Sequence, residues 1–264
     1  MKFVILSGLA AFGLLAASLA FLAVGRRIGA RRLHLDPKGG SAGHAAVEAA
    51  VFGLLGLLLA FTFSGAMQRF DDRRQLIAEE ANAITTAYWQ ADLLSPEARS
   101  AFRDTLRQYL NARVELSRHP RLIDWGQEFL RPDDVARSEA LQAKIWQIAI
   151  NPNHHQRTES VEQVLLPTLT SMFAVARARN SIGQRHPPEI IYGMLFGLTL
   201  VSSLLAGYGM AASKAPSWVH MIGFALSLAG TVFVICDVEF PRSGLIRVDT
   251  FDQVLINALG KAPD

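Results

Sequence analysis

The chain has 264 residues, of which half are hydrophobic and only 19% are charged. An ordinary soluble domain has about 25% charged residues, so this chain is short of charge. The shortage lies in four stretches without Asp, Glu, Lys or Arg, at 3–24, 49–67, 190–212 and 218–236. Each is near the ~20 apolar residues that cross a bilayer. This pattern excludes a soluble enzyme and a disordered chain.

The net charge of +3 arises mainly between the first two apolar stretches, where Arg26, Arg27, Arg31, Arg32 and Lys38 lie. Basic clusters beside membrane spans are signals of topology. The segment 68–189 holds 16 basic and 16 acidic residues and is therefore neutral. Because a nucleic-acid-binding domain needs a basic face, we expect no nucleic acid among the partners.

The first apolar stretch has two interpretations. Lys2 precedes it, and Ser18-Leu19-Ala20 resembles a cleavage site, which would suit a secretory signal. Its 22 uncharged residues, however, exceed the 7–15 that are usual for the apolar core of a signal peptide, which favours a retained membrane span.

The second apolar stretch continues into a polar helix. No helix breaker follows it, and Phe70, Ile77, Ile84 and Ala91 recur every seven residues as a stripe that faces a partner helix. We therefore predict one continuous helix from about Ala46 to Leu94, which would be on the order of 70 Å long.

The remainder of the polar segment also has helical patterns. Ser95 and Pro96 predict the start of a second helix, a third is expected to reach Ile150, and a fourth is expected to be kinked near Pro167. We predict an all-α protein with four transmembrane helices. Its parts are 1–67, the first two spans with a basic connecting loop; 68–189, a helical extramembrane domain; 190–240, a transmembrane hairpin; and 241–264, a C-terminal tail.

Five charges follow the second span within six residues: Arg69, Asp71, Asp72, Arg73 and Arg74. One interpretation is an interfacial stop at the position where water begins. The other is a charged collar where copies of the helix meet, in which Asp71 reaches Arg74 and the arginines attract anions.

A second polar group follows this collar. Glu79, Glu80 and Asn82 form a solvated helix face in one interpretation. In the other, a buried network joins Asn82 and one glutamate to arginines that precede the third span, with Arg177, Arg179 and Arg185 as candidates. Since buried charges are costly unless they are paired, burial discriminates between the two.

The sequence gives no positive sign of catalysis. It has no HExxH or CxxC metal motif, no phosphate-binding glycine loop and no GxSxG nucleophile motif. Asp237 and Glu239 are too few carboxylates for a full cation site. We therefore expect no enzyme activity, no metal and no cofactor.

The stretch GLLGLLLAFTFSGAMQRFDDRR at 53–74, with EEANAITTAYW at 79–89 and PRSGLIRV at 241–248, resembles the bacterial bestrophin-like proteins, a four-span family. The resemblance covers most of 46–250. It implies a bacterial inner-membrane protein related to pentameric anion channels whose second span lines the pore. Phe70-Asp-x-Arg73 matches the family's aromatic-Asp-Arg run, whereas its paired tryptophans and the acidic calcium clasp of animal bestrophins are absent.

We therefore predict an oligomeric pore, with membrane lipid, copies of the chain, and chloride or another small anion as partners. Leu57, Phe61 and Ser64 share one helix side and are the pore-lining candidates, unless that side packs against the other spans. The alternative is a non-conducting scaffold or signalling component whose helical domain binds a protein. The basic cluster favours the helical domain outside, while the family layout requires the reverse, so its side stays open.

Overall fold

The computed structural model describes residues 2–35, 42–118, 121–123, 127–154, 158–182, 187–212, 218–240, 245–246 and 249–258. The chain divides into two compact units. The membrane unit contains Met1–Gln68 and His186–Ile246, and the helical unit contains Arg69–Arg185 and Arg247–Asp264. Each unit is described by itself.

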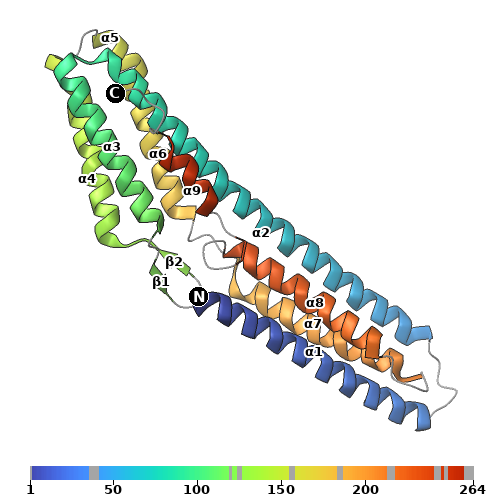
Figure 1. Ribbon diagram of the computed structural model, residues 1–264. Coiled ribbons are helices and arrows are strands. Elements are labelled where there is room, and N and C mark those ends of the chain that lie inside the picture. The colour runs from blue at the N-terminus through green and yellow to red at the C-terminus, as the bar shows by residue number, and fades with distance from the viewer. Residues whose placement is uncertain are drawn as a thin grey trace. The chain divides into compact units, whose positions relative to one another are not determined.

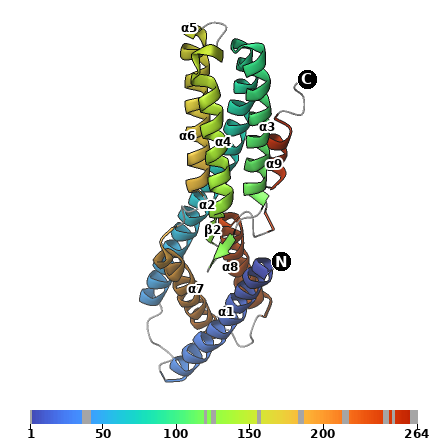
Figure 2. The same ribbon diagram turned by 90° about the vertical axis from the view of Figure 1, so that its left-hand side faces the viewer.

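Most of the described residues lie in helices, several of them long (Figures 1 and 2). The elements of the membrane unit are α1 (Lys2–Leu35), the first part of α2 (Ala42–Gln90), α7 (Glu189–Gly209), the 3₁₀ turn Met210–Ala212 and α8 (Trp218–Glu239). Those of the helical unit are the rest of α2, the 3₁₀ turns Ala91–Leu93 and Pro152–His154, α3 (Pro96–Arg118), β1 (Arg121–Ile123), β2 (Gln127–Phe129), α4 (Pro132–Ile150), α5 (Thr158–Ser160), the π-helical turn Val161–Leu165, α6 (Leu166–Ile182) and α9 (Asp249–Ile256).

Within the described residues, four helices are long and apolar enough to cross a membrane: α1, α2, α7 with its 3₁₀ turn, and α8. The helices α3, α4 and α5 lie between the second and third of these in the chain. The prediction of an all-α protein with four spans is therefore confirmed. One small departure is the antiparallel pairing of β1 with β2 between α3 and α4.

The backbones of α1 and α7 approach each other closely because glycines stand at the crossing. A Cβ on Gly25 would overlap the carbonyl oxygen of Leu204, and a Cβ on Gly207 would overlap that of Leu22. Small residues allow this approach in membrane helices, where van der Waals packing rather than water exclusion holds helices together. Gly29 meets Tyr208 and Ala211 one turn further on, so the two helices run in the same direction.

The predicted continuous helix is present. α2 is unbroken from Ala42 to Gln90, and a 3₁₀ turn continues it to Leu93. Its apolar stretch 49–67 belongs to the membrane unit, and its charged part belongs to the helical unit. In the latter, the seven-residue stripe is buried as expected, with Ile77 and Ile84 in the main core. Phe102 and Leu106 from α3 and Leu165 and Leu169 from the fourth helical segment fill the same core.

The fourth helical segment departs from regular α geometry where a proline is expected to disturb it. A π-helical turn, Val161–Leu165, separates α5 from α6, and Pro167 is the second residue after this turn. Proline has no N–H and cannot donate to the carbonyl of the preceding turn, so the local change of helix type has a clear cause.

Two boundaries differ from the prediction. α1 extends to Leu35, so Arg26, Arg27, Arg31 and Arg32 lie on a helix and not in a connecting loop. The predicted C-terminal tail contains α9, which belongs to the helical unit. Leu255 of α9 is fully buried in the core of the helical unit, and the Thr85 hydroxyl donates to the carbonyl of Ala258 at 3.0 Å.

Candidate functional site

The membrane part of α2 has one packed face and one open face. Leu55 is 3% exposed, and Leu58 and Leu59 pack on the cluster that Leu14, Leu195, Ala229 and Val232 form. On the open face, Leu57 is 52% exposed, Phe61 is 68% exposed, and Ser64 is also exposed. The side with the pore-lining candidates therefore does not pack against the other spans of the same chain, in so far as the structure describes them.

The charged collar begins the helical unit. Arg74 lies 3.2 Å from Asp71, as the spacing predicts, and both side chains are substantially exposed. The guanidinium of Arg74 also lies 5.7 Å from the centroid of the Phe70 ring. Asp72 is exposed, Arg69 is half-buried and Arg73 is buried. The ion pair between Arg74 and Asp71 is exposed and therefore contributes little to stability in water.

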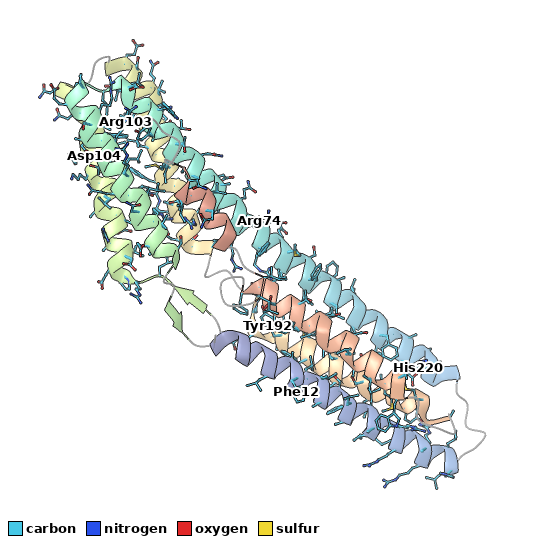
Figure 3. The ribbon with its side chains drawn as sticks, viewed as in Figure 1. Phe12, Arg74, Arg103, Asp104, Tyr192 and His220 are labelled. Atoms are coloured by element: carbon cyan, nitrogen blue, oxygen red, sulfur yellow. The ribbon has the colours of Figure 1, made fainter. Side chains whose placement is uncertain are left out.

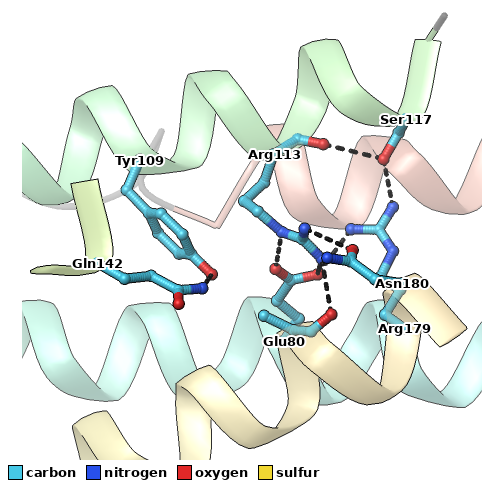
Figure 4. Close-up of polar contacts among 8 residues, drawn as sticks. Glu80, Tyr109, Arg113, Ser117, Gln142, Arg179 and Asn180 are labelled. Carbon is cyan, nitrogen blue, oxygen red and sulfur yellow. Dashed lines mark hydrogen bonds and ion pairs between the residues drawn. The ribbon is translucent and has the colours of Figure 1, made fainter. Parts of the chain in front are cut away.

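A largely buried ion network lies nearly two helical turns beyond this collar (Figure 4). Glu80 of α2 has no exposed surface and accepts hydrogen bonds from Arg113 of α3 and from Arg179 of α6. The Arg179 Nη1–Glu80 Oε2 distance is 2.7 Å, and the side chain of Arg113 is only 1% exposed. One carboxylate therefore joins three helices through two guanidinium groups.

Further polar groups complete the Glu80 network. Arg113 donates to the side-chain oxygen of Asn180 at 2.8 Å and to the carbonyl of Ala176 at 3.4 Å. Arg179 donates to the hydroxyl of Ser117, which itself donates to the carbonyl of Arg113. Buried charges need such complete pairing because each loses its hydration on folding.

Charge attraction outweighs burial at the Glu80 carboxyl. Burial alone would raise the pKa of Glu80, but the charges and hydrogen bonds of Arg113 and Arg179 lower it below the ordinary value of 4.5. Burial would likewise lower the pKa of Arg113, and the Glu80 charge raises it instead. Both groups therefore stay ionised, and the network carries two positive charges and one negative charge.

Tyr109 lies near this network and is also fully buried. Its hydroxyl accepts a hydrogen bond from Gln142 at 3.2 Å (Figure 4). Burial, together with the Glu80 charge, raises the pKa of Tyr109 above its ordinary value. This phenol therefore remains neutral and serves as a hydrogen-bonding core residue.

Six residues were considered for a buried network, and two of them, Glu80 and Arg179, contact each other in the structure. Asn82 and Arg177 are exposed, so they do not belong to the buried group, and Glu79 is half-buried and accepts from Gln75 at 2.7 Å. Arg185 lies outside the described residues.

Sequence reasoning missed Arg113, Ser117 and Asn180. The sequence does contain a signal that Arg113 is buried. This residue continues the buried stripe of α3 that includes Leu106 and Leu110, where an apolar residue is expected. A charged residue in such a position needs a partner on a neighbouring helix. The identity of this partner, Glu80, depends on how α2 packs against α3, and the stripe alone does not specify that packing.

Near the end of α8, the Asp237 carboxylate binds the backbone of two residues that follow this helix. The carboxylate of Asp237 accepts from the backbone N–H groups of Leu245 and Ile246, each at 2.8 Å at the nearer oxygen. Among the described residues, no three His, Cys, Asp or Glu side chains gather as a metal site would require.

Tyr192 and His220, the polar ring side chains that Figure 3 labels in the membrane unit, lie on different helices, α7 and α8.

The comparisons agree with this architecture. The model of one family, described as the Bestrophin-like domain, matches residues 11–251. No curated protein and no solved structure matches the chain. The match covers most of the chain, including nearly all of the first candidate span, the other three spans and the helices between them. The chain is therefore a multi-pass membrane protein that belongs to the bestrophin-like family.

Proposed function

We propose that the protein forms an oligomeric, channel-like pore for chloride or another small anion, lined by α2. The open face of α2 carries this proposal, because Leu57, Phe61 and Ser64 remain exposed after the opposite face has packed on the other spans. A ring of these faces from several copies would enclose a path with a hydrophobic constriction, which gates by dewetting.

The charges that follow the membrane part of α2 suit an anion. This segment contains three arginines, Arg69, Arg73 and Arg74, and two aspartates, Asp71 and Asp72. Its net charge in each copy is therefore +1. Repeated around a symmetric ring, a small positive surplus raises the local anion concentration. We include in the proposal a bacterial inner-membrane location and the absence of enzyme activity, with the side of the helical unit left open.

Chloride flux from liposomes tests the proposal. Purified full-length protein is reconstituted with internal chloride, and release is followed with a chloride electrode. We expect release to require the protein and to change when Phe61 is replaced by Ala, since this side chain would line the constriction. Leu55→Ala, on the packed face, is the control for nonspecific leak. An absence of chloride release from protein that is correctly inserted would contradict the proposal.

A second candidate is a non-conducting scaffold whose helical unit binds a protein partner. Trp89 favours it, because this indole is 47% exposed and lies edge-on to Tyr88, whose ring Arg103 covers at 4.4 Å. Tryptophan, tyrosine and arginine are enriched where proteins bind each other. A monomer or dimer after detergent purification, combined with the absence of flux, would favour this candidate over the pore.

A further inference from the structure

A basic surface lies at the end of α1 where the chain leaves the apolar stretch. Arg27, Arg31 and Arg32 are exposed there; we call these three residues the arginine surface. Arg27 and Arg31 are one helical turn apart, and Arg32 follows directly. The apolar stretch ends at Val24, so the arginines cover the next ~10 Å of the helix, about the depth of a lipid headgroup layer.

The charges around this surface are one-sided. α2 and α8 begin and α7 ends at the same end of the membrane unit, because α1 and α7 run in parallel and the spans alternate in direction. Among the residues that the structure describes there, Glu48 is the sole carboxylate, and it lies near Gly209 of α7. The arginines therefore exceed the local acidic charge, in contrast to the balanced helical unit.

Apolar side chains accompany the arginines. Ile28 is 49% exposed, Leu33 is 48% exposed and Leu35 is 87% exposed. Trp218, at the start of α8, is 61% exposed, and tryptophan prefers the boundary between lipid and water. A mixture of guanidinium groups and exposed apolar groups is typical of helices that contact both headgroups and acyl chains.

We propose that the arginine surface binds the phosphate groups of anionic phospholipids. Guanidinium groups present paired N–H donors that match phosphate oxygens, and each basic residue near a membrane surface strengthens its attraction for anionic lipid. The apolar neighbours favour a lipid over a free phosphate ion, because they would be covered by acyl chains. This binding goes beyond the proposed pore and does not depend on whether the protein conducts.

Fluorescence quenching by brominated lipids tests this proposal on the full-length protein. Trp218 borders a span, while Trp89, Trp125 and Trp146 lie within the polar segment 68–189. The protein is reconstituted in phosphatidylcholine with brominated phosphatidylglycerol or brominated phosphatidylcholine. We expect brominated phosphatidylglycerol to quench Trp218 at lower mole fraction, with a preference of roughly fivefold for each arginine that reaches a headgroup.

The triple variant Arg27→Gln, Arg31→Gln, Arg32→Gln should abolish this preference, and high salt should weaken it in the unchanged protein. The matched control is Arg131→Gln, Arg137→Gln, Arg177→Gln, which removes the same charge from exposed positions of the helical unit and should retain the preference. Circular dichroism and gel filtration check that both variants fold. Equal quenching by the two lipids, or a preference that the triple variant keeps, would overturn the proposal. Displacement of the lipid by inorganic phosphate at constant ionic strength would identify a free-anion site instead.

Discussion

The two units of the chain are held together by different physical means. In the membrane unit, α1 and α7 meet through glycines, and the apolar stretches contain no Asp, Glu, Lys or Arg. In the helical unit, an apolar core surrounds a fully paired ion network of Glu80, Arg113 and Arg179. The surroundings of each unit explain why the stabilising interactions differ. Burial of apolar groups stabilises a fold only where the unfolded chain is exposed to water. Helices in lipid are held together by close van der Waals contact instead. Substitutions should therefore act through charge in one unit and through shape in the other.

The largest effect is expected from Glu80→Gln. This change keeps the shape of the side chain but leaves Arg113 buried without its counter-charge. Removal of one partner of a buried ion pair costs about 3–5 kcal/mol of stability. Urea unfolding of the full-length protein, followed by the fluorescence of Trp146, measures the loss. Glu79→Gln is the matched control and should change the unfolding free energy little, because Glu79 is only half-buried. Equal effects of the two substitutions would refute the assigned role of the network.

Acid should reproduce part of this loss. The pKa of Glu80 is lowered in the folded protein, so its ionisation stabilises the fold at pH values above the ordinary pKa of 4.5. As the pH falls below 4.5 and through the folded pKa, this stabilisation disappears. Unfolding free energies measured over an acidic pH series should fall less steeply for Glu80→Gln than for the unchanged protein. Parallel pH curves would show that Glu80 does not contribute.

The membrane unit should respond to a single methyl group. Gly207→Ala places a Cβ against the carbonyl of Leu22 and forces α1 and α7 apart, at a cost of about 1–3 kcal/mol for overpacking. Gly193→Ala in the same helix is the control, because its Cβ would meet open space. Thermal unfolding in detergent compares the two. If both variants melt alike, the close crossing of α1 and α7 is wrong.

The smallest effect is expected at Tyr109. Tyr109→Phe removes the hydroxyl that accepts from Gln142 and should cost about 0.5–1.5 kcal/mol, the net contribution of one hydrogen bond. The same urea experiment measures it, with Gln142→Leu as the second arm of a double-mutant cycle. Additive effects of the two changes would show that this hydrogen bond does not couple the residues.

The sequence specifies the fold more completely than the site. The four charge-free stretches and the seven-residue stripe of α2 follow from composition and periodicity, which depend on local physics. The partners of Glu80 depend on which helix faces which, and periodicity does not determine that choice. Arg179 could be proposed because it is one of few arginines before the third span, whereas Arg113 lies within an apolar stripe and was overlooked.

Cysteine accessibility on α2 tests the central claim most directly. In a Cys236→Ala background, which removes the single native cysteine, Phe61→Cys and Ser64→Cys are reconstituted and exposed to a negatively charged methanethiosulfonate reagent. If their face lines a water-filled anion path, both should react and chloride flux should change, while Leu55→Cys on the packed face should not react. Phe61→Cys and Ser64→Cys that stay as unreactive as Leu55→Cys would place this face against lipid or protein and contradict the pore.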